Sequence, residues 1–346
     1  KFKILKWDGV KPKTRIQETA RKTRYKLMTS WCKKKGIEKL FLAHHLDDQV
    51  ETFLMRLSKG SGVDGLAVMN FVTETSSLKL VRPFLEIPKT RFIKILSITN
   101  LEWILDPSNL NLDYKRSRIR KILPILSEEG INSKQIGLAI KRMRSVKNAL
   151  NAQTDILLKK YLSNVDNVAY FLNKELFKDE KEKEILLRVL EKIFMNISGS
   201  IYPPRRNKLD NILSWILENN NVKAKTLTGV VVRKRKSEFI FYREPEDCYK
   251  SVNIRPLTSR YRCWDDRFFL RANKSNSLQI KALGDVGITI LKEEKILKRQ
   301  GFKNVPLSAW KTVPGVWSKK RLISVPTLGY YKQKDLKIYI KSNKNI

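Results

Sequence analysis

The first 60 positions carry an apolar pattern that predicts a helix, a short buried strand and a second helix. Residues 14–35 have an apolar stripe at roughly helical spacing, with Thr14 as a candidate cap and Gly36 at the end. Residues 37–43 read IEKLFLA, which is typical of a buried strand, and residues 47–59 return to helical spacing. This alternation indicates a parallel-sheet domain.

The pattern continues with shorter strands and helices as far as residue 126. Strands are predicted over Leu78–Phe84 and Trp103–Leu105, and a helix is predicted over residues 89–99. The turn-forming residues Asp106–Asn109 precede a basic helix over residues 114–126, which is expected to end at its proline.

The character of the chain changes after Asn132. Helical spacing over residues 132–162, 183–197 and 209–217 predicts an all-helical middle region. Alternating residues in Val230–Val232 and Glu238–Tyr242, separated by a basic turn, then predict a β-hairpin. Short strands and turns after residue 264 indicate a small mixed domain.

These patterns predict an α/β protein of three parts, with soft boundaries. Residues 1–128 form a Rossmann-like parallel-sheet domain, and residues 129–250 form a helical domain that ends in the hairpin. Residues 251–346 form the small C-terminal α/β domain.

The chain has 71 lysines and arginines against 34 aspartates and glutamates, a formal charge of 71 − 34 = +37. Such a charge favours a polyanionic partner, because basic groups near phosphates release condensed counterions. Codon bias in an AT-rich genome is the alternative explanation. The basic residues also cluster, as on a surface that follows a phosphate backbone: 115–121, 141–147, 205–208 and 233–236.

The cysteines and the apolar runs restrict the protein class. Cys32, Cys248 and Cys263 are scattered and form no CxxC pair, which argues against a disulfide framework and a zinc ribbon. A reducing cytoplasm is the simplest compartment. No uncharged apolar run is long enough to span a bilayer, so no membrane association is expected.

The only two histidines, His44 and His45, are adjacent and begin the segment HHLDDQVET. They follow the predicted strand at its carboxyl end, where open α/β sheets bind ligands. Neighbouring strand residues point to opposite faces, so the two are not expected to share one metal. A site with His44 and Asp48 is one interpretation, with Mg²⁺ as the metal that suits a hard carboxylate oxygen. In the other interpretation, Asp47 caps the following helix and the histidines fill space.

A glycine-rich segment at Gly60, Gly62 and Gly65 matches GxGxxG but follows a helix. A dinucleotide-binding fingerprint must follow a strand and open a helix. The segment alone is therefore better explained as a turn.

Taken together, these motifs resemble the tRNA(Ile)-lysidine synthetase family of PP-loop ATP pyrophosphatases. Six elements occur in the family's order, and three later segments, 226–232, 264–268 and 313–317, resemble its C-terminal modules more weakly. The six elements are Ala20-Arg21 with Arg24-Tyr25, HHLDDQVET, GSGVDGL, Val81–Phe84, Asp106–Asn109, and Arg116–Arg120 ahead of Leu123-Pro124.

The sequence departs from the family pattern at two places. The family's glycine-rich SGGxDS loop is not found, and we expect it upstream of Lys1, so the parallel-sheet domain is expected to be incomplete. In the basic element, Ser117 and Lys121 stand where the family usually has Asn and His.

The resemblance implies ligation of lysine to the wobble cytidine of tRNA(Ile) with a CAU anticodon, through an adenylated tRNA. ATP and Mg²⁺ are the implied cofactors, with free lysine as the second substrate. The implied catalytic residues are His44, Asp48, Arg24 and Arg116, with Asp48 also a metal ligand. Nucleotide-binding roles are implied for six others: Arg21, His45, Gly60, Gly62, Gly65 and Arg120.

Several alternatives stay open at this point. Asp47, Glu51 and Asp64 are equal candidates for binding the lysine ammonium, and the oligomeric state, monomer or homodimer, is open. A PP-loop tRNA thiolase is the nearest rival function, although the cysteines lack the spacing for sulfur transfer. An inactive tRNA-binding remnant is the rival from another class.

Overall fold

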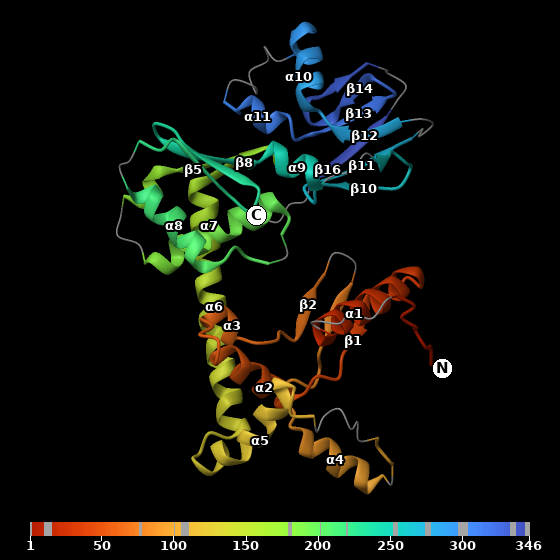
Figure 1. Ribbon diagram of the computed structural model, residues 1–346, viewed down its shortest axis with the longest axis vertical. Coiled ribbons are helices and arrows are strands. Elements are labelled where there is room, and N and C mark those ends of the chain that lie inside the picture. The colour runs from red at the N-terminus through yellow and green to blue at the C-terminus, as the bar shows by residue number, and fades with distance from the viewer. Residues whose placement is uncertain are drawn as a thin grey trace. The chain divides into compact units, whose positions relative to one another are not determined.

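The computed structural model describes most of the chain, and two compact units divide it at Ala149 (Figure 1). The first unit is Lys1–Ala149 and the second is Leu150–Ile346. The described residues are 2–9, 16–75, 78–99, 101–104, 111–178, 182–200, 202–218, 221–251, 255–273, 278–296, 304–332 and 337–342. Among their helices, none is both long and apolar enough to cross a membrane.

A three-stranded sheet in the order β1-β3-β2 forms the centre of the first unit. Strands β1 and β3 are parallel, with Leu40 opposite Leu80, and β2 is antiparallel to β3. The parallel pair confirms the expected strand type, but β1 is shorter than the expected strand. The elements of this unit are α1 Ile16–Lys34, β1 Lys39–Phe41, α2 Leu46–Leu57, α3 Val63–Leu66, β2 Val72–Glu74, β3 Lys79–Val81, α4 Lys89–Ile98 and α5 Lys115–Glu128, and α6 Ser133–Tyr161 runs on into the second unit.

Two apolar clusters hold the first unit together. In one, α1 packs on the sheet through Cys32, Leu78 and Leu80. In the other, α2 packs against α6 through Val50 and Ile140, which are 0% and 1% exposed. The strand and the helices are thereby fixed around the point where β1 leads into α2.

Two local expectations for the first unit are wrong. Helix α5 continues through Pro124 to Glu128, because a proline removes only one backbone hydrogen bond and the rest of the helix persists. Trp103 and Ile104 are not in a strand, and both are well exposed, at 44% and 96%, so they bury too little to pair there. Leu105 and the turn Asp106–Asn109 lie outside the described residues.

A five-stranded antiparallel sheet in the order β4-β5-β8-β7-β6 lies in the middle of the second unit. It contains the predicted hairpin, β7 and β8, which is confirmed. The expectation of an all-helical middle region is wrong, because β4 and β5 lie between α6 and α7. The elements are β4 Leu162–Val165, β5 Ala169–Asn173, the 3-10 helix η2 Lys174–Phe177, α7 Lys183–Ser198, α8 Arg206–Leu217, β6 Ala224–Leu227, β7 Val230–Lys234, β8 Glu238–Arg243 and α9 Pro245–Ser251.

The two faces of this sheet belong to two different cores. Phe239 and Phe241 of β8 pack in the cluster formed with α7 and α8. Ile240 and Tyr242, which alternate with them along β8, pack in a cluster with the C-terminal strands. A strand buried on both faces has no polar alternation, which explains why β5, with the sequence AYFLN, gives no clear strand signal.

The C-terminal part of the second unit contains two further sheets. One has the order β15-β14-β13-β12-β9 and the other the order β10-β11-β16. The strands expected in this region are present, and two short helices accompany them. The elements are β9 Arg255–Pro256, β10 Arg262–Trp264, β11 Phe268–Ala272, β12 Leu278–Ala282, α10 Gly284–Glu293, α11 Leu307–Trp310, β13 Pro314–Ser318, β14 Arg321–Val325, the 3-10 helix η5 Pro326–Leu328, β15 Tyr330–Tyr331 and β16 Ile338–Ser342. The boundaries of the three predicted domains, at 128 and 250, stay a prediction.

A buried ion cluster connects these C-terminal strands to β8. Arg243 Nε lies 3.2 Å from both carboxylate oxygens of Asp265, and Arg267 Nε donates to Asp265 Oδ2 at 2.8 Å. The side chains of Arg243, Asp265 and Arg267 are only 2–4% exposed. A carboxylate so deeply buried depends on its two guanidinium partners for charge compensation.

We expect Asp265→Ala to destabilise the second unit by about 3–5 kcal/mol, because it leaves Arg267 buried without its carboxylate. Asp285→Ala is the matched control: its carboxylate pairs with Lys311 on the surface and is 77% exposed, so about 0–1 kcal/mol is expected. Urea unfolding followed by circular dichroism measures both. Equal midpoints for the two variants would contradict this account.

Candidate functional site

The chain changes from strand to helix at residues 42–46. Leu42 N–H donates to Val81 O at 2.8 Å and so extends the pairing beyond β1, while Leu46 N–H donates to Ile87 O at 3.0 Å. Between these two anchors, His44 and His45 connect the sheet to α2. The carboxyl end of the parallel pair therefore holds both histidines, as the sequence predicts.

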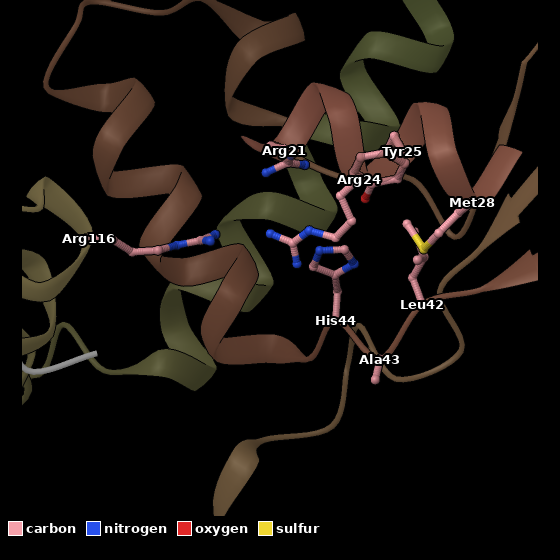
Figure 2. Close-up of a pocket in the computed structure, with 8 residues that line it drawn as sticks. All are labelled: Arg21, Arg24, Tyr25, Met28, Leu42, Ala43, His44 and Arg116. Carbon is pink, nitrogen blue, oxygen red and sulfur yellow. The ribbon is translucent and has the colours of Figure 1, made fainter. Parts of the chain in front are cut away.

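A cavity of about 330 Å³ opens at this point and is lined by side chains from three parts of the chain, two of which supply arginines. Helix α1 supplies one wall, the segment after β1 supplies the floor, and α5 supplies Arg116. Figure 2 shows Arg24 and Arg116 pointing toward the His44 ring. The lining residues are Arg21, Arg24, Tyr25, Met28, Leu42, Ala43, His44 and Arg116.

The lining combines three guanidinium groups with an apolar wall. Arginine is always charged and presents a fork of N–H donors that matches phosphate oxygens. Tyr25, Met28 and Leu42 offer apolar surface beside these donors. A cavity with this lining suits an anion that also carries a flat apolar group, as a nucleotide does.

His44 faces this cavity in its neutral form. Burial lowers its pKa below the ordinary 6.5; the Asp48 carboxylate raises it, and the charges of Arg82, Arg21 and Arg116 lower it further. Its Nδ1 is buried without a hydrogen-bond partner among the described residues. A neutral imidazole in this position can exchange a hydrogen bond with a ligand without adding to the positive charge.

His45 lies against carboxylates instead. Its Nδ1 is 3.4 Å from Asp47 Oδ2, its Nε2 is 3.5 Å from Asp48 Oδ2, and its ring is 6.5 Å from that of Phe92. The contact with Asp47 raises the pKa of His45. The two histidines therefore have different surroundings, and His45 does not line the cavity.

The two aspartates after the histidines fix helix termini. Asp48 Oδ2 accepts the backbone N–H of His45 at 3.1 Å, at the start of α2. Asp47 Oδ2 accepts the backbone N–H of Lys89 at 2.7 Å, at the start of α4. The alternative interpretation, in which Asp47 caps α2, is therefore wrong, because the Asp47 side chain accepts its hydrogen bond from the start of α4.

Glu51, on α2, lies between two arginines of α5. Its Oε2 is 2.7 Å from Arg116 Nε and its Oε1 is 2.5 Å from Arg120 Nε, while the Glu51 side chain is only 3% exposed. Arg116 Nη2 also donates to Thr52 Oγ1 at 3.2 Å. Arg120 therefore pairs with Glu51 beside the cavity but is not among the residues that line it.

The three glycines of the GxGxxG segment are not among the lining residues. They lie in the turn after α2 and in the short helix α3, in agreement with the interpretation of a turn. A Cβ at Gly65 would come within 2.6 Å of the Ser61 Cβ, and Arg56 Nη1 donates to Gly65 O at 2.6 Å. This close packing explains the glycine at position 65.

The structure thus brings four of the ten predicted site residues together: Arg21, Arg24, His44 and Arg116. The apolar wall of the cavity, formed by Tyr25, Met28 and Leu42, is not among the predicted site residues. Arg21, Arg24, Tyr25 and Met28 are spaced i, i+3, i+4, i+7, which is one face of a helix. That spacing was the available signal, because it mixes two cations with two apolar residues on one face.

Comparison with known proteins adds the family. A PP-loop domain model matches residues 1–126. The tRNA(Ile)-lysidine synthase of Wolbachia pipientis wMel is 31% identical over 333 residues, which cover 94% of this chain and 74% of that protein. The enzyme of the same name from Ruegeria pomeroyi is 30% identical over 325 residues, with the same two coverages. The chain belongs to the tRNA(Ile)-lysidine synthase family.

The extent of the match differs among the members of this family. The tRNA(Ile)-lysidine synthase of Wolbachia sp. subsp. Brugia malayi is 35% identical over 267 residues, 77% of this chain but only 61% of the length of that relative. Among solved structures, a U34-tRNA thiolase from Methanococcus maripaludis gives a TM-score of 0.32 at 18% identity, covering 37% of this chain and 44% of that one.

The two histidines should change the free energy of unfolding in opposite directions as the pH changes. The lowered pKa of His44 means that the unfolded chain binds this proton more tightly, so protonation destabilises the fold as the pH falls below 6.5. The raised pKa of His45 stabilises the fold below pH 6.5, and this contribution is lost as the pH rises through the raised value.

We therefore expect His44→Gln to reduce the rise of the melting temperature with pH, and His45→Gln to steepen it, across about pH 5 to 8. Circular dichroism melts at closely spaced pH values measure the slopes. Because the chain has only two histidines, each variant serves as the control for the other. Slopes that change in the same direction in both variants would refute the assignment.

Proposed function

We propose that this chain carries the ATP-cleaving site of an enzyme that attaches lysine to the wobble cytidine of tRNA(Ile) with a CAU anticodon. The observation that carries the proposal is the cavity in which Arg21, Arg24 and Arg116 converge on a neutral His44. Membership of the tRNA(Ile)-lysidine synthase family supports the choice of substrate.

The proposed reaction has two steps. The carbonyl oxygen at the 2-position of the cytosine attacks the α-phosphorus of ATP, so that an O–P bond forms and pyrophosphate leaves. The ε-amine of free lysine then attacks C2, the ring carbon that bears this oxygen. AMP leaves with the oxygen, and the amine loses a proton. The product is lysidine, in which a new C–N bond has replaced the C–O bond.

The lining residues suit the first step. Negative charge develops on the phosphates as pyrophosphate leaves, and fixed cations lower the energy of that state. Arg21, Arg24 and Arg116 supply such cations from α1 and α5. Neutral His44 is placed to exchange a hydrogen bond with the nucleotide at the same wall.

Magnesium would join this site through Asp48. The described residues include no group of three His, Cys, Asp or Glu side chains that could hold a metal by themselves. A single carboxylate still fits Mg²⁺, which is commonly held by one or two carboxylates together with substrate phosphates. When bound, the ion would neutralise phosphate charge.

The charge of +37 supports tRNA as the large substrate. Basic residues on the second unit, such as Lys225, Lys234 and Arg235, would contact the phosphate backbone. A base in a single-stranded anticodon loop can be turned out into a pocket at modest cost. A homodimer stays a prediction.

We expect Asp48→Asn to abolish lysine incorporation into tRNA(Ile). The asparagine oxygen can still accept the His45 N–H, so the helix start is kept while the carboxylate charge is lost. The assay follows labelled lysine and pyrophosphate release by the natural gene product that contains residues 1–346. Asp285→Asn, on the exposed face of α10, is the control and should keep full activity.

Two results would overturn the proposal in different ways. Lysine incorporation that is undiminished in Asp48→Asn removes Asp48 from the site. A natural protein that binds tRNA(Ile) but releases no pyrophosphate with ATP, tRNA and lysine present would favour the inactive tRNA-binding remnant.

The cysteines provide a test against the thiolase alternative. Cys32 is 2% exposed and Cys248 is 0% exposed, and burial raises the pKa of Cys248 to about 12. A thiol protonated and buried in this way is a poor sulfur carrier. We expect a variant with Cys32→Ala, Cys248→Ala and Cys263→Ser to keep lysine incorporation. Sulfur transfer to tRNA by the parent protein, lost in a variant that still melts cooperatively, would favour the thiolase.

A further inference from the structure

Glu51 is a fully buried carboxylate beside the cavity. It lies on α2 one helical turn after Asp48, and the residue as a whole is 2% exposed. Moving a carboxylate out of water costs several kcal/mol unless it is paired and hydrogen-bonded. Its presence in this position therefore depends on the groups around it.

Both oxygens of Glu51 are engaged by α5. Oε2 lies 2.7 Å from Arg116 Nε, and Oε1 lies 2.5 Å from Arg120 Nε. The bond to Glu51 raises the pKa of Arg120. The two arginines are one helical turn apart, so a single carboxylate holds one face of α5 against α2.

Arg116 needs such an anchor more than Arg120 does. It lines the cavity together with Arg21 and Arg24, whose like charges oppose its approach. An arginine side chain also loses rotamer freedom when it is fixed. The ion pair with Glu51 and the bond to Thr52 Oγ1 offset both costs and leave the guanidinium pointing toward His44 (Figure 2).

We propose that Glu51 is a positioning residue, which holds Arg116 in the cavity for contact with the phosphates of ATP. It is therefore not the group that binds the ammonium of the lysine substrate. This inference rests on the proposed function for the identity of the anion. Its geometric part, that Glu51 fixes Arg116, rests on the contacts alone.

The lysine-binding alternative conflicts with these contacts. An ammonium bound at Glu51 would have to displace a guanidinium, because each carboxylate oxygen already has one within 2.7 Å. It would also lie beside two fixed positive charges. Replacing a delocalised guanidinium by an ammonium in so little space gains no new charge compensation.

The direction in which Glu51→Gln changes ATP affinity tests the positioning role. If Glu51 acted only through its charge, Glu51→Gln would make the cavity more positive, and ATP would bind more tightly. If it positions Arg116, the same variant frees the guanidinium and ATP binds more weakly, on the order of tenfold, since small misplacements of a binding group are costly. Isothermal titration of ATP into the full chain measures this without any turnover.

The second unit offers a matched control. Glu184 also bridges two arginines, with its Oε1 at 2.9 Å from Arg188 Nε and its Oε2 at 2.7 Å from Arg206 Nη1. Glu184→Gln removes the same charge from another glutamate that lies between two arginines, here with a side chain that is 38% exposed. Its helix, α7, contributes no residue to the cavity lining. We expect ATP affinity to be unchanged in this variant, and tighter or unchanged ATP binding in Glu51→Gln would overturn the positioning role.

A half-reaction distinguishes positioning from lysine binding. Pyrophosphate release from ATP and tRNA in the absence of lysine should fall in Glu51→Gln, on the order of 10²-fold, while the KM for lysine stays the same. A normal half-reaction with a raised KM for lysine would assign Glu51 to the lysine site instead. If the unmodified protein releases no pyrophosphate, the proposed function fails, and the ATP titration still decides the geometric part.

Glu51→Asp guards against a variant that fails to fold. It keeps the charge but shortens the side chain by one methylene, so it can reach one guanidinium better than the other. We expect it to fold, because Arg116 and Arg120 are 35% and 37% exposed and can be partly solvated. Its ATP affinity should fall between those of the parent and Glu51→Gln. An affinity equal to the parent's would show that the length of the side chain at position 51 does not matter for placing Arg116, which contradicts the positioning role.

Discussion

The buried carboxylate of Glu51 lies between Arg116 and Arg120 and connects α2 to α5. It keeps the Arg116 guanidinium in a cavity that Arg21 and Arg24 also line. Like charges at this density would disperse if nothing opposed them. Glu51 opposes them from behind the cavity, where it neutralises charge without occupying space that a ligand needs. Arg116 is thereby both accessible and fixed. Part of its guanidinium stays available to an anion in the cavity, while its Nε is held by Glu51 of α2.

The two histidines between β1 and α2 also limit the positive charge in the cavity. His44 loses its charge through burial, whereas His45 gains a stronger hold on its proton from Asp47. Adjacent residues in extended backbone point in opposite directions, so one segment turns His44 toward the cavity and His45 toward the carboxylates of Asp47 and Asp48. A protonated imidazole in the cavity would add repulsion to the three guanidinium groups that already repel one another.

The sequence predicts most helices of the fold and several residues of the cavity. The elements and contacts that it does not predict have physical reasons. Periodicity located α1, α2 and α7, because each buries one face. It missed β5, which is covered on both faces. One of the two interpretations of the histidine segment made Asp47 the cap of α2, because the sequence shows only the helix that follows Asp47 directly. The partner of Asp47 is Lys89, 42 positions away. The pairing of Glu51 with α5 is likewise long-range, and no local pattern distinguishes it from a solvated glutamate on a helix surface.

Charge alone therefore says little about what an acidic side chain does near this site. Three acids were equal candidates for the lysine ammonium, and the structure gives each a different surrounding: Asp47 at a helix start, Glu51 between guanidiniums, and Asp64 3.4 Å from Lys147. Asp64 is the most exposed of the three, with 49% of its side chain accessible. An ammonium arriving from water would replace a loose contact of Asp64 more easily than a buried pair of Glu51, since surface ion pairs contribute only about 0–1 kcal/mol. Each of these three carboxylates already has a partner, and the strength of that contact decides which of them can receive another cation.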